Sequence, residues 1–175
     1  ASNTSYAGVI SGSGGLTKSG TGALTLTGAT SYSGGTIVRQ GTLRINGGSV
    51  THTSTDMVAG YAAGDDGALT IENGGTLESW RGIIGYFANS EGIATVTGEN
   101  STWTNTGDLL VGQSGEGALI VENGGLVTAN VIIAGHYDGS EGTIRVEGGD
   151  SRMTSAGLLR IGDEGKGNLL VAGGG

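Results

Sequence analysis

Acidic side chains recur at a fixed interval in this sequence and are the first candidates for chemistry. Asp66, Glu91, Glu116 and Glu141 follow one another at a constant spacing, each directly before a glycine, and Lys166 takes the next place in the series. Neighbouring carboxylates can bind a divalent cation or a basic partner, and carboxylates also serve as acids and bases in catalysis. Duplication of a tolerated surface turn produces the same series. We favour this second interpretation and expect no metal ion or cofactor.

Two tryptophans are the other candidates for a binding surface, because an exposed aromatic ring can stack on a sugar or pack against another protein. Trp103 shares its place in the repeat with Met153, which predicts that it fills the core. Trp80 shares its place with Asn130, which predicts an exposed ring. Trp80 is therefore the aromatic residue that we expect to contact a ligand or partner.

The other reactive residues form no recognisable catalytic pattern. His52 and His136 have dissimilar neighbours and no nucleophile elbow beside them, so both are predicted to be solvated turn residues. The pairs Asp65–Asp66 and Asp163–Glu164 lie in predicted turns and are predicted to be solvated charges. Adjacent residues in a strand would point to opposite faces, so neither pair is predicted to form a catalytic pair of carboxylates. The sequence contains no P-loop, calcium-binding nonapeptide or paired-histidine metal motif. We predict no catalytic residue.

Composition excludes several classes of protein. The chain has 175 residues, of which 39 are glycine, with no proline, no cysteine and a net charge of −8. Without proline or a three-residue glycine period it is not collagen, and 35% hydrophobic residues argue against disorder. The negative charge argues against nucleic acid or an anionic membrane as partner. No apolar run approaches the ~18 residues of a membrane span, and the first residues lack signal-peptide features, which predicts a cytosolic, processed or excised chain.

The elements that must position these side chains repeat with the same spacing as the carboxylates. A glycine in each unit precedes a short apolar alternation such as Leu69-Thr70-Ile71, and a second apolar run such as Ile83-Ile84-Gly85 ends in glycine. The similarity is closer at twice this period, and alternate units differ by a turn one residue longer. A less regular copy runs from Thr42 to Gly67. The repeat glycines, with a constant offset of 25 in sequence number, are Gly67, Gly92, Gly117, Gly142 and Gly167.

Short alternating runs between Asn-Gly and Gly-Gly turns predict an all-β chain. A propeller blade needs ~40–45 residues, more than the unit offers. We therefore predict a right-handed parallel β-helix (a β-solenoid) with three short strands per ~25-residue coil and the glycines at its corners. We expect one continuous solenoid over residues 1–175, of roughly seven coils, in which residues 1–42 form coils of a different type from those of residues 43–175.

Two stretches of the sequence carry a family resemblance. Residues 22–45 contain Gly-Ala-Leu-Thr-Leu-Thr-Gly, Tyr-Ser-Gly-Gly-Thr-Ile-Val and Gly-Thr-Leu-Arg-Ile, after the lead-in Gly-Gly-Leu-Thr-Lys-Ser-Gly. This stretch resembles the β-strand repeat of bacterial autotransporter passenger domains. The units from about residue 43 to 175 resemble a second repeat, associated with type V secretion, in their Gly-Gly turn, Gly-x-Asn-Ser-x-Trp segment and Leu-Leu-Val-Gly strand.

The resemblance implies a right-handed β-helix on a Gram-negative cell surface or secreted from it. Such passengers are exported through a C-terminal β-barrel, which is expected outside this segment, and the segment itself would not enter the membrane. The expected role is that of a rigid stalk or adhesin in adhesion, autoaggregation or biofilm formation, with a host-cell or matrix surface or neighbouring passengers as partner. A glycan-binding module or a polysaccharide-lyase-like enzyme is the alternative that stays open.

Overall fold

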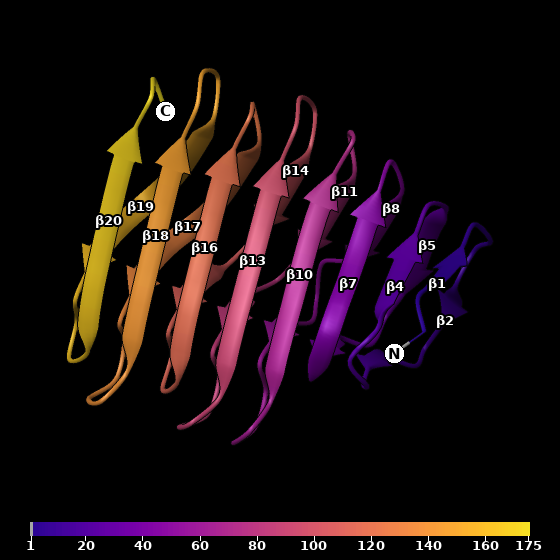
Figure 1. The fold of residues 1–175 in the computed structure, drawn as a ribbon, viewed down its shortest axis with the longest axis horizontal. Helices are drawn as coiled ribbons and strands as arrows, with labels where there is room; N and C mark the ends of the chain where they lie inside the picture. Colours follow the sequence, from indigo (N-terminus) through magenta and orange to yellow (C-terminus); the bar gives the residue numbers. More distant parts are fainter. Residues whose placement is uncertain (1) are drawn as a thin grey trace.

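The computed structural model describes residues 2–175, which form short β-strands joined by turns and loops (Figure 1). The two ends of the chain lie at opposite ends of the long axis. In chain order the strands are β1 (Thr4–Tyr6), β2 (Ser11–Gly12), β3 (Leu16–Lys18), β4 (Ala23–Leu26), β5 (Ala29–Tyr32), β6 (Thr36–Val38), β7 (Gln40–Asn46), β8 (Ser49–His52), β9 (Met57–Ala59), β10 (Asp66–Glu72), β11 (Thr76–Ser79), β12 (Gly82–Ile84), β13 (Glu91–Thr97), β14 (Thr102–Asn105), β15 (Asp108–Val111), β16 (Glu116–Glu122), β17 (Leu126–Ala134), β18 (Glu141–Glu147), β19 (Arg152–Ile161) and β20 (Lys166–Ala172).

The first strand of every coil belongs to one parallel sheet, with the order β1-β4-β7-β10-β13-β16-β18-β20 (Figure 1). The second and third strands form another sheet, β2-β5-β8-β11-β14-β17-β15-β12-β9-β6-β3, to which β19 adds by pairing with β17. Each strand therefore pairs with its equivalents in the coils before and after it. The chain is an all-β parallel β-solenoid, as predicted. Its right-handedness stays a prediction.

Coil length changes along the chain. Thr4 pairs with Leu24 and Leu24 with Leu43, so the first two turns have sequence offsets of 20 and 19. From β7 onward about five longer turns follow, with an offset of 26 at first and of 25 thereafter, because Leu43 pairs with Leu69 and Leu69 with Ala94. The first sheet continues through both regions without a break.

Alternate coils have the same number of residues but divide them differently between their turns and the loop after the third strand. The first strands keep a constant offset of 25, whereas the third strands are offset by 27 between Gly82 and Leu109 and by 23 between Leu109 and Ile132. One extra residue in the first turn and one before the third strand are thus compensated by a loop after the third strand that is two residues shorter. As a result, the residues that begin β10, β13, β16, β18 and β20 stay in line.

Stacked aliphatic side chains fill the interior because alternate residues of each first strand point inward. These residues are at most 4% exposed. One column consists of Leu43, Leu69, Ala94, Leu119 and Ile144, and the next of Ile45, Ile71, Val96, Val121 and Val146. Trp103 is 1% exposed and its Nε1 donates to the Ser79 hydroxyl at 3.1 Å, so its predicted place in the core is confirmed.

The third strands β9, β12 and β15 and the last residues of β17 are buried on both faces. Their outward residues Val58, Ile83, Leu110 and Ile133 form a second apolar cluster, which we call the outer cluster. It is covered in part by tyrosines from the loops that follow the third strands, and these loops are absent from the shorter N-terminal coils. The side chains packed against the outer cluster are Ile37, Tyr61, Tyr86 and Val131.

Two columns of glycine form a seam where the third strand of a coil approaches the first strand of its neighbour. A Cβ atom on Gly92 would overlap the carbonyl oxygen of Ala59 and the amide of Gly85. Gly85 has φ +73°, and a Cβ there would overlap the carbonyl oxygen of Glu116. Only glycine permits both approaches. The repeat glycines thus lie one residue inside each first strand, next to the corner predicted for them from the sequence.

Candidate functional site

The four recurring carboxylates form one row along the solenoid. Asp66, Glu91, Glu116 and Glu141 are the first residues of β10, β13, β16 and β18, and the register places each opposite the next. All four are exposed, and Lys166 follows opposite Glu141. We call this row the acidic ladder. It lies directly after the loops that end each coil.

Loop carbonyls from the preceding coil hold the backbone of the acidic ladder. The Glu91 amide donates to the Asp65 carbonyl at 2.9 Å, and the Glu116 amide donates to the Ser90 carbonyl at 2.9 Å. Glu141 repeats this contact with Gly115 at 3.2 Å. The ladder therefore has a fixed backbone and exposed side chains.

A shallow groove of about 310 Å³ runs beside the acidic ladder, with Ile93, Ala118 and Thr143 in its floor. A second groove of about 250 Å³ begins at Asp66 and extends past Gln40 toward the N-terminus. Within residues 2–175 no group of three or more histidine, cysteine or acidic residues is arranged to hold a metal ion. The row of negative charges attracts cations in general and disfavours an anionic polymer beside it.

Trp80 lies at a different corner of the coil, between β11 and β12. Its ring is 45% exposed, as the sequence predicts, and the Arg81 guanidinium stacks 4.5 Å from the ring centroid. Two hydrogen bonds, at 3.1 and 2.8 Å, join Arg81 to the Asp56 carboxylate, and this partner raises the pKa of Arg81. Gly107 in the next coil leaves room for the ring. The structure does not bring Trp80 and the acidic ladder together at one corner.

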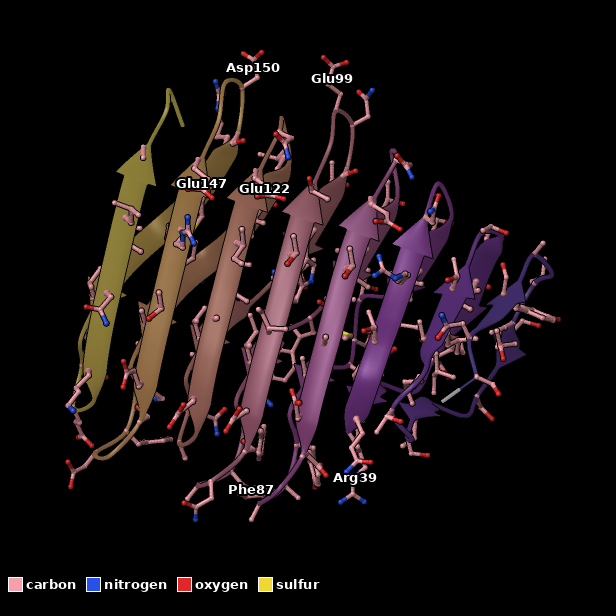
Figure 2. The ribbon with its side chains drawn as sticks, in the orientation of Figure 1. Arg39, Phe87, Glu99, Glu122, Glu147 and Asp150 are labelled. Carbon is pink, nitrogen blue, oxygen red and sulfur yellow. The ribbon has the colours of Figure 1, made fainter. Side chains whose placement is uncertain are left out.

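A group of aromatic residues on the loops after the third strands was not predicted from the sequence. Tyr61 and Tyr86 are stacked at 5.4 Å, and Phe87 packs edge-on against Tyr86 at 4.4 Å. Two coils beyond Phe87, Tyr137 lies 4.1 Å from the ring of His136. These loops project at one rim of the solenoid, where Figure 2 labels Phe87, opposite the rim that carries Glu99 and Asp150. A glycine-aromatic pair that recurs at the repeat period and at twice that period was the signal that could have revealed them.

The prediction that His52 is a solvated turn residue is wrong. His52 ends β8 and is 3% exposed, because the strand alternates and Val50 and His52 share its inner face. Its Nε2 is hydrogen-bonded to the Thr36 hydroxyl at 3.0 Å, and Thr36 is also hydrogen-bonded to the Tyr32 hydroxyl. Burial lowers the pKa of His52.

Asp65 is likewise buried, not solvated as predicted. It is 6% exposed and accepts hydrogen bonds from the Ala62 amide at 2.9 Å and from Arg39 Nε at 3.0 Å. These contacts depend on how the loop folds and on an arginine one coil away, which local sequence does not reveal. Its neighbour Asp66 is exposed, in agreement with the prediction.

His136 and Asp163 are half-buried partners and not free turn residues. His136 Nδ1 lies 3.0 Å from Asp163 Oδ2, and Arg160 donates to the other carboxylate oxygen at 2.6 Å. Burial by itself raises the pKa of Asp163, but the hydrogen bonds from Arg160 and His136 outweigh it, so that the net shift is downward. Glu164 is exposed, as predicted.

Comparison with known proteins gives two matches. Residues 16–45 match the passenger-associated-transport-repeat family. The "Extracellular serine protease" of Serratia marcescens is 38% identical over 96 residues, which are 54% of this chain and 8% of that protein. The chain thus spans a small fraction of that relative's length. No solved structure matches the chain significantly.

The stacked coils and the matched repeat together define an autotransporter passenger-type β-helix segment. This agrees with the family resemblance of residues 22–45. Association with passenger domains implies a location at the cell surface or in the secreted fraction. In residues 2–175 there is no helix with the length and apolar character that a membrane crossing requires.

Proposed function

We propose that this segment is a rigid stalk with an adhesive surface in a bacterial surface protein, and that it performs no catalysis of its own. The observation that carries the proposal is the constant register of the first sheet, in which Gly67, Gly92, Gly117 and Gly142 pair in succession. Each coil contacts only its neighbours, so the molecule lengthens without needing a larger core. Such a stack holds a distal partner away from the cell.

The adhesive part of the proposal rests on the contrast between interior and corners. The interior columns consist of buried aliphatic residues, whereas the corners carry exposed groups, either a carboxylate repeated in four successive coils or loop side chains that change between coils. The acidic ladder, Trp80 and the loop aromatics all lie on these corners. Exposed groups of this kind suit a host-cell or matrix surface, or a neighbouring passenger, as partner. A polysaccharide-lyase-like activity stays an alternative that no contact among the described residues favours.

A deletion of residues 91–140 in the full surface protein tests the proposal. It removes two whole coils and joins Ser90 to Glu141, which keeps both the register and the alternation of loop lengths. We expect reduced cell adhesion and aggregation with normal surface display, measured by antibody binding to a distal epitope. Unchanged adhesion with intact display would reduce the segment to a spacer and contradict its adhesive role.

A further inference from the structure

The loops after the third strands have two lengths, and the long ones present aromatic side chains. Five residues separate Gly85 from Glu91 and Gly135 from Glu141, whereas three separate Gly112 from Glu116. A third loop of this length follows Gly60, and the second residue after the glycine is Ala62 there, Phe87 after Gly85 and Tyr137 after Gly135. These rings are 47% and 46% exposed, although both are large and apolar. Exposed rings at equivalent positions of two coils are typical of a binding surface.

The same contacts hold both loops in place. The Ser90 hydroxyl donates to the Phe87 carbonyl at 2.6 Å, and the Ser140 hydroxyl donates to the Tyr137 carbonyl at 2.6 Å. The glycine of the next short loop lies against these groups, since a Cβ on Gly115 would contact both the Phe87 and Ser90 carbonyl oxygens. The backbone that carries each ring is therefore ordered before any ligand binds, which lowers the entropic cost of binding.

Each of the two exposed rings packs against a neighbouring aromatic ring. Phe87 packs edge-on against Tyr86 at 4.4 Å and against Tyr61 at 5.4 Å, and Tyr86 in turn contacts the outer cluster. Tyr137 lies 4.1 Å from the ring of His136, which the Asp163 carboxylate holds at 3.0 Å. Each exposed ring thus rests on a second ring that is itself fixed.

The spacing of the exposed rings gives the shape of the ligand. Phe87 and Tyr137 are separated by two coils, about 10 Å along the solenoid axis at ~4.8 Å per coil. That separation is close to the advance of about two rings in an extended β-linked sugar chain, so alternate sugars could stack on the two aromatic rings. The coil between them presents Gln113 and Ser114, whose amide and hydroxyl groups can bond sugar hydroxyls.

The adjacent charges determine which kind of sugar chain fits. Glu91 and Glu141, two members of the acidic ladder, follow directly after the loops that carry the rings. Carboxylates accept hydrogen bonds from sugar hydroxyls but repel a polyanion. We propose that the loop surface around Phe87 and Tyr137 binds an extended, uncharged β-linked polysaccharide that runs along the solenoid axis. The inference rests on the proposed adhesive function, of which it names the ligand class.

Titration calorimetry of the 175-residue chain with cellohexaose tests this inference. Maltohexaose serves as a control of the same sugar with a curved, α-linked chain, and polygalacturonate serves as an anionic one. We expect binding of cellohexaose alone, weakened about tenfold by Phe87→Ala or Tyr137→Ala and lost in the double variant. Tyr6→Ala, which removes a 44%-exposed ring far from these loops, is the matched control and should bind as the parent does.

Circular dichroism establishes that each variant is folded before titration. Absence of cellohexaose binding to the parent chain, equal binding of maltohexaose, or undiminished binding by the double variant would each overturn the inference. Binding of a protein partner to this surface in place of any sugar would overturn it as well. The deletion of residues 91–140 tests adhesion separately, so a failed sugar titration with an adhesion defect rejects the ligand class and keeps the adhesive function.

Discussion

The short N-terminal coils and the longer coils that follow β7 close their turns by different means. In the short coils the third strand β3 ends at Lys18, which is 8% exposed and whose amine donates to the carbonyls of Gly20 at 2.6 Å and Gln40 at 2.9 Å. In the long coils the glycine seam brings backbone against backbone, and a loop follows before the next strand. Coils of both lengths therefore stack by the same strand pairing, provided that the carbonyl groups at the corners have hydrogen-bond partners.

The added loop is what makes the long coils a candidate for binding. Its residues Tyr61 and Tyr86 pack against the outer cluster, and it places Phe87 and Tyr137 at the rim. Both regions also bury a hydrogen-bonded polar group, which consists of Tyr32, Thr36 and His52 where the long coils begin and of Ser79, Trp103 and Asn105 farther along. The long coils thus differ from the short ones chiefly in the loop that follows the third strand.

The largest expected effect on the free energy of unfolding comes from removing the largest core side chain of the long coils. Trp103→Ala removes a fully buried indole and leaves the Ser79 hydroxyl without its donor. We expect the free energy of unfolding to fall by about 4 kcal/mol, measured by urea denaturation. Tyr6→Ala in the N-terminal coils removes an exposed ring and should change it by less than ~0.5 kcal/mol. Equal losses would contradict the assignment of Trp103 to the core.

The glycine seam is tested by adding a single methyl group. Gly92→Ala forces a Cβ into the carbonyl oxygen of Ala59, and we expect a loss of about 3 kcal/mol of unfolding free energy in chemical denaturation. Gly149→Ala is the matched control, since a Cβ there has nothing within 4 Å. If both variants are as stable as the parent chain, the seam does not require glycine.

The closure of the short coils depends on the buried amine. Lys18→Met keeps the length of the side chain but leaves the carbonyls of Gly20 and Gln40 without this donor, with an expected loss of about 2 kcal/mol. Lys166→Met, at an exposed position in the long coils, should fall within ~0.5 kcal/mol of the parent. Thermal denaturation of the two variants compares them, and indistinguishable melting temperatures would remove this distinction between the regions.

The smallest effect concerns the pH dependence of stability. Burial lowers the pKa of His52 below its ordinary value of 6.5, so the unfolded chain binds a proton at this site more readily than the folded chain. Stability contributed by neutral His52 is complete above pH 6.5 and declines as the pH falls below it. Melting temperatures between pH 8 and 5 should show this decline, and His52→Phe should lessen it. An identical pH profile in the variant would exclude His52 as its source.

The sequence predicted those features that depend on period and alternation. The constant spacing of Gly67 and Gly92 gave the coil and its corner, and the equivalence of Trp103 with Met153 gave a core position. The burial of Asp65 was missed because it requires Arg39 from another coil. The exposure of Phe87 was missed because the alternation of the strands does not reveal which loop ring packs on the outer cluster and which one projects from it.

The central claim is that the chain is one rigid stack in which every coil adds one strand to the first sheet. Because the protein has no cysteine, Thr25→Cys and Leu170→Cys allow two spin labels to be placed on the first sheet. Six successive strand pairings separate the two positions. Pulsed electron spin resonance should give one narrow distance near ~29 Å, which shortens by about 10 Å when residues 91–140 are deleted. A broad distribution, or a distance unchanged by the deletion, would contradict the account.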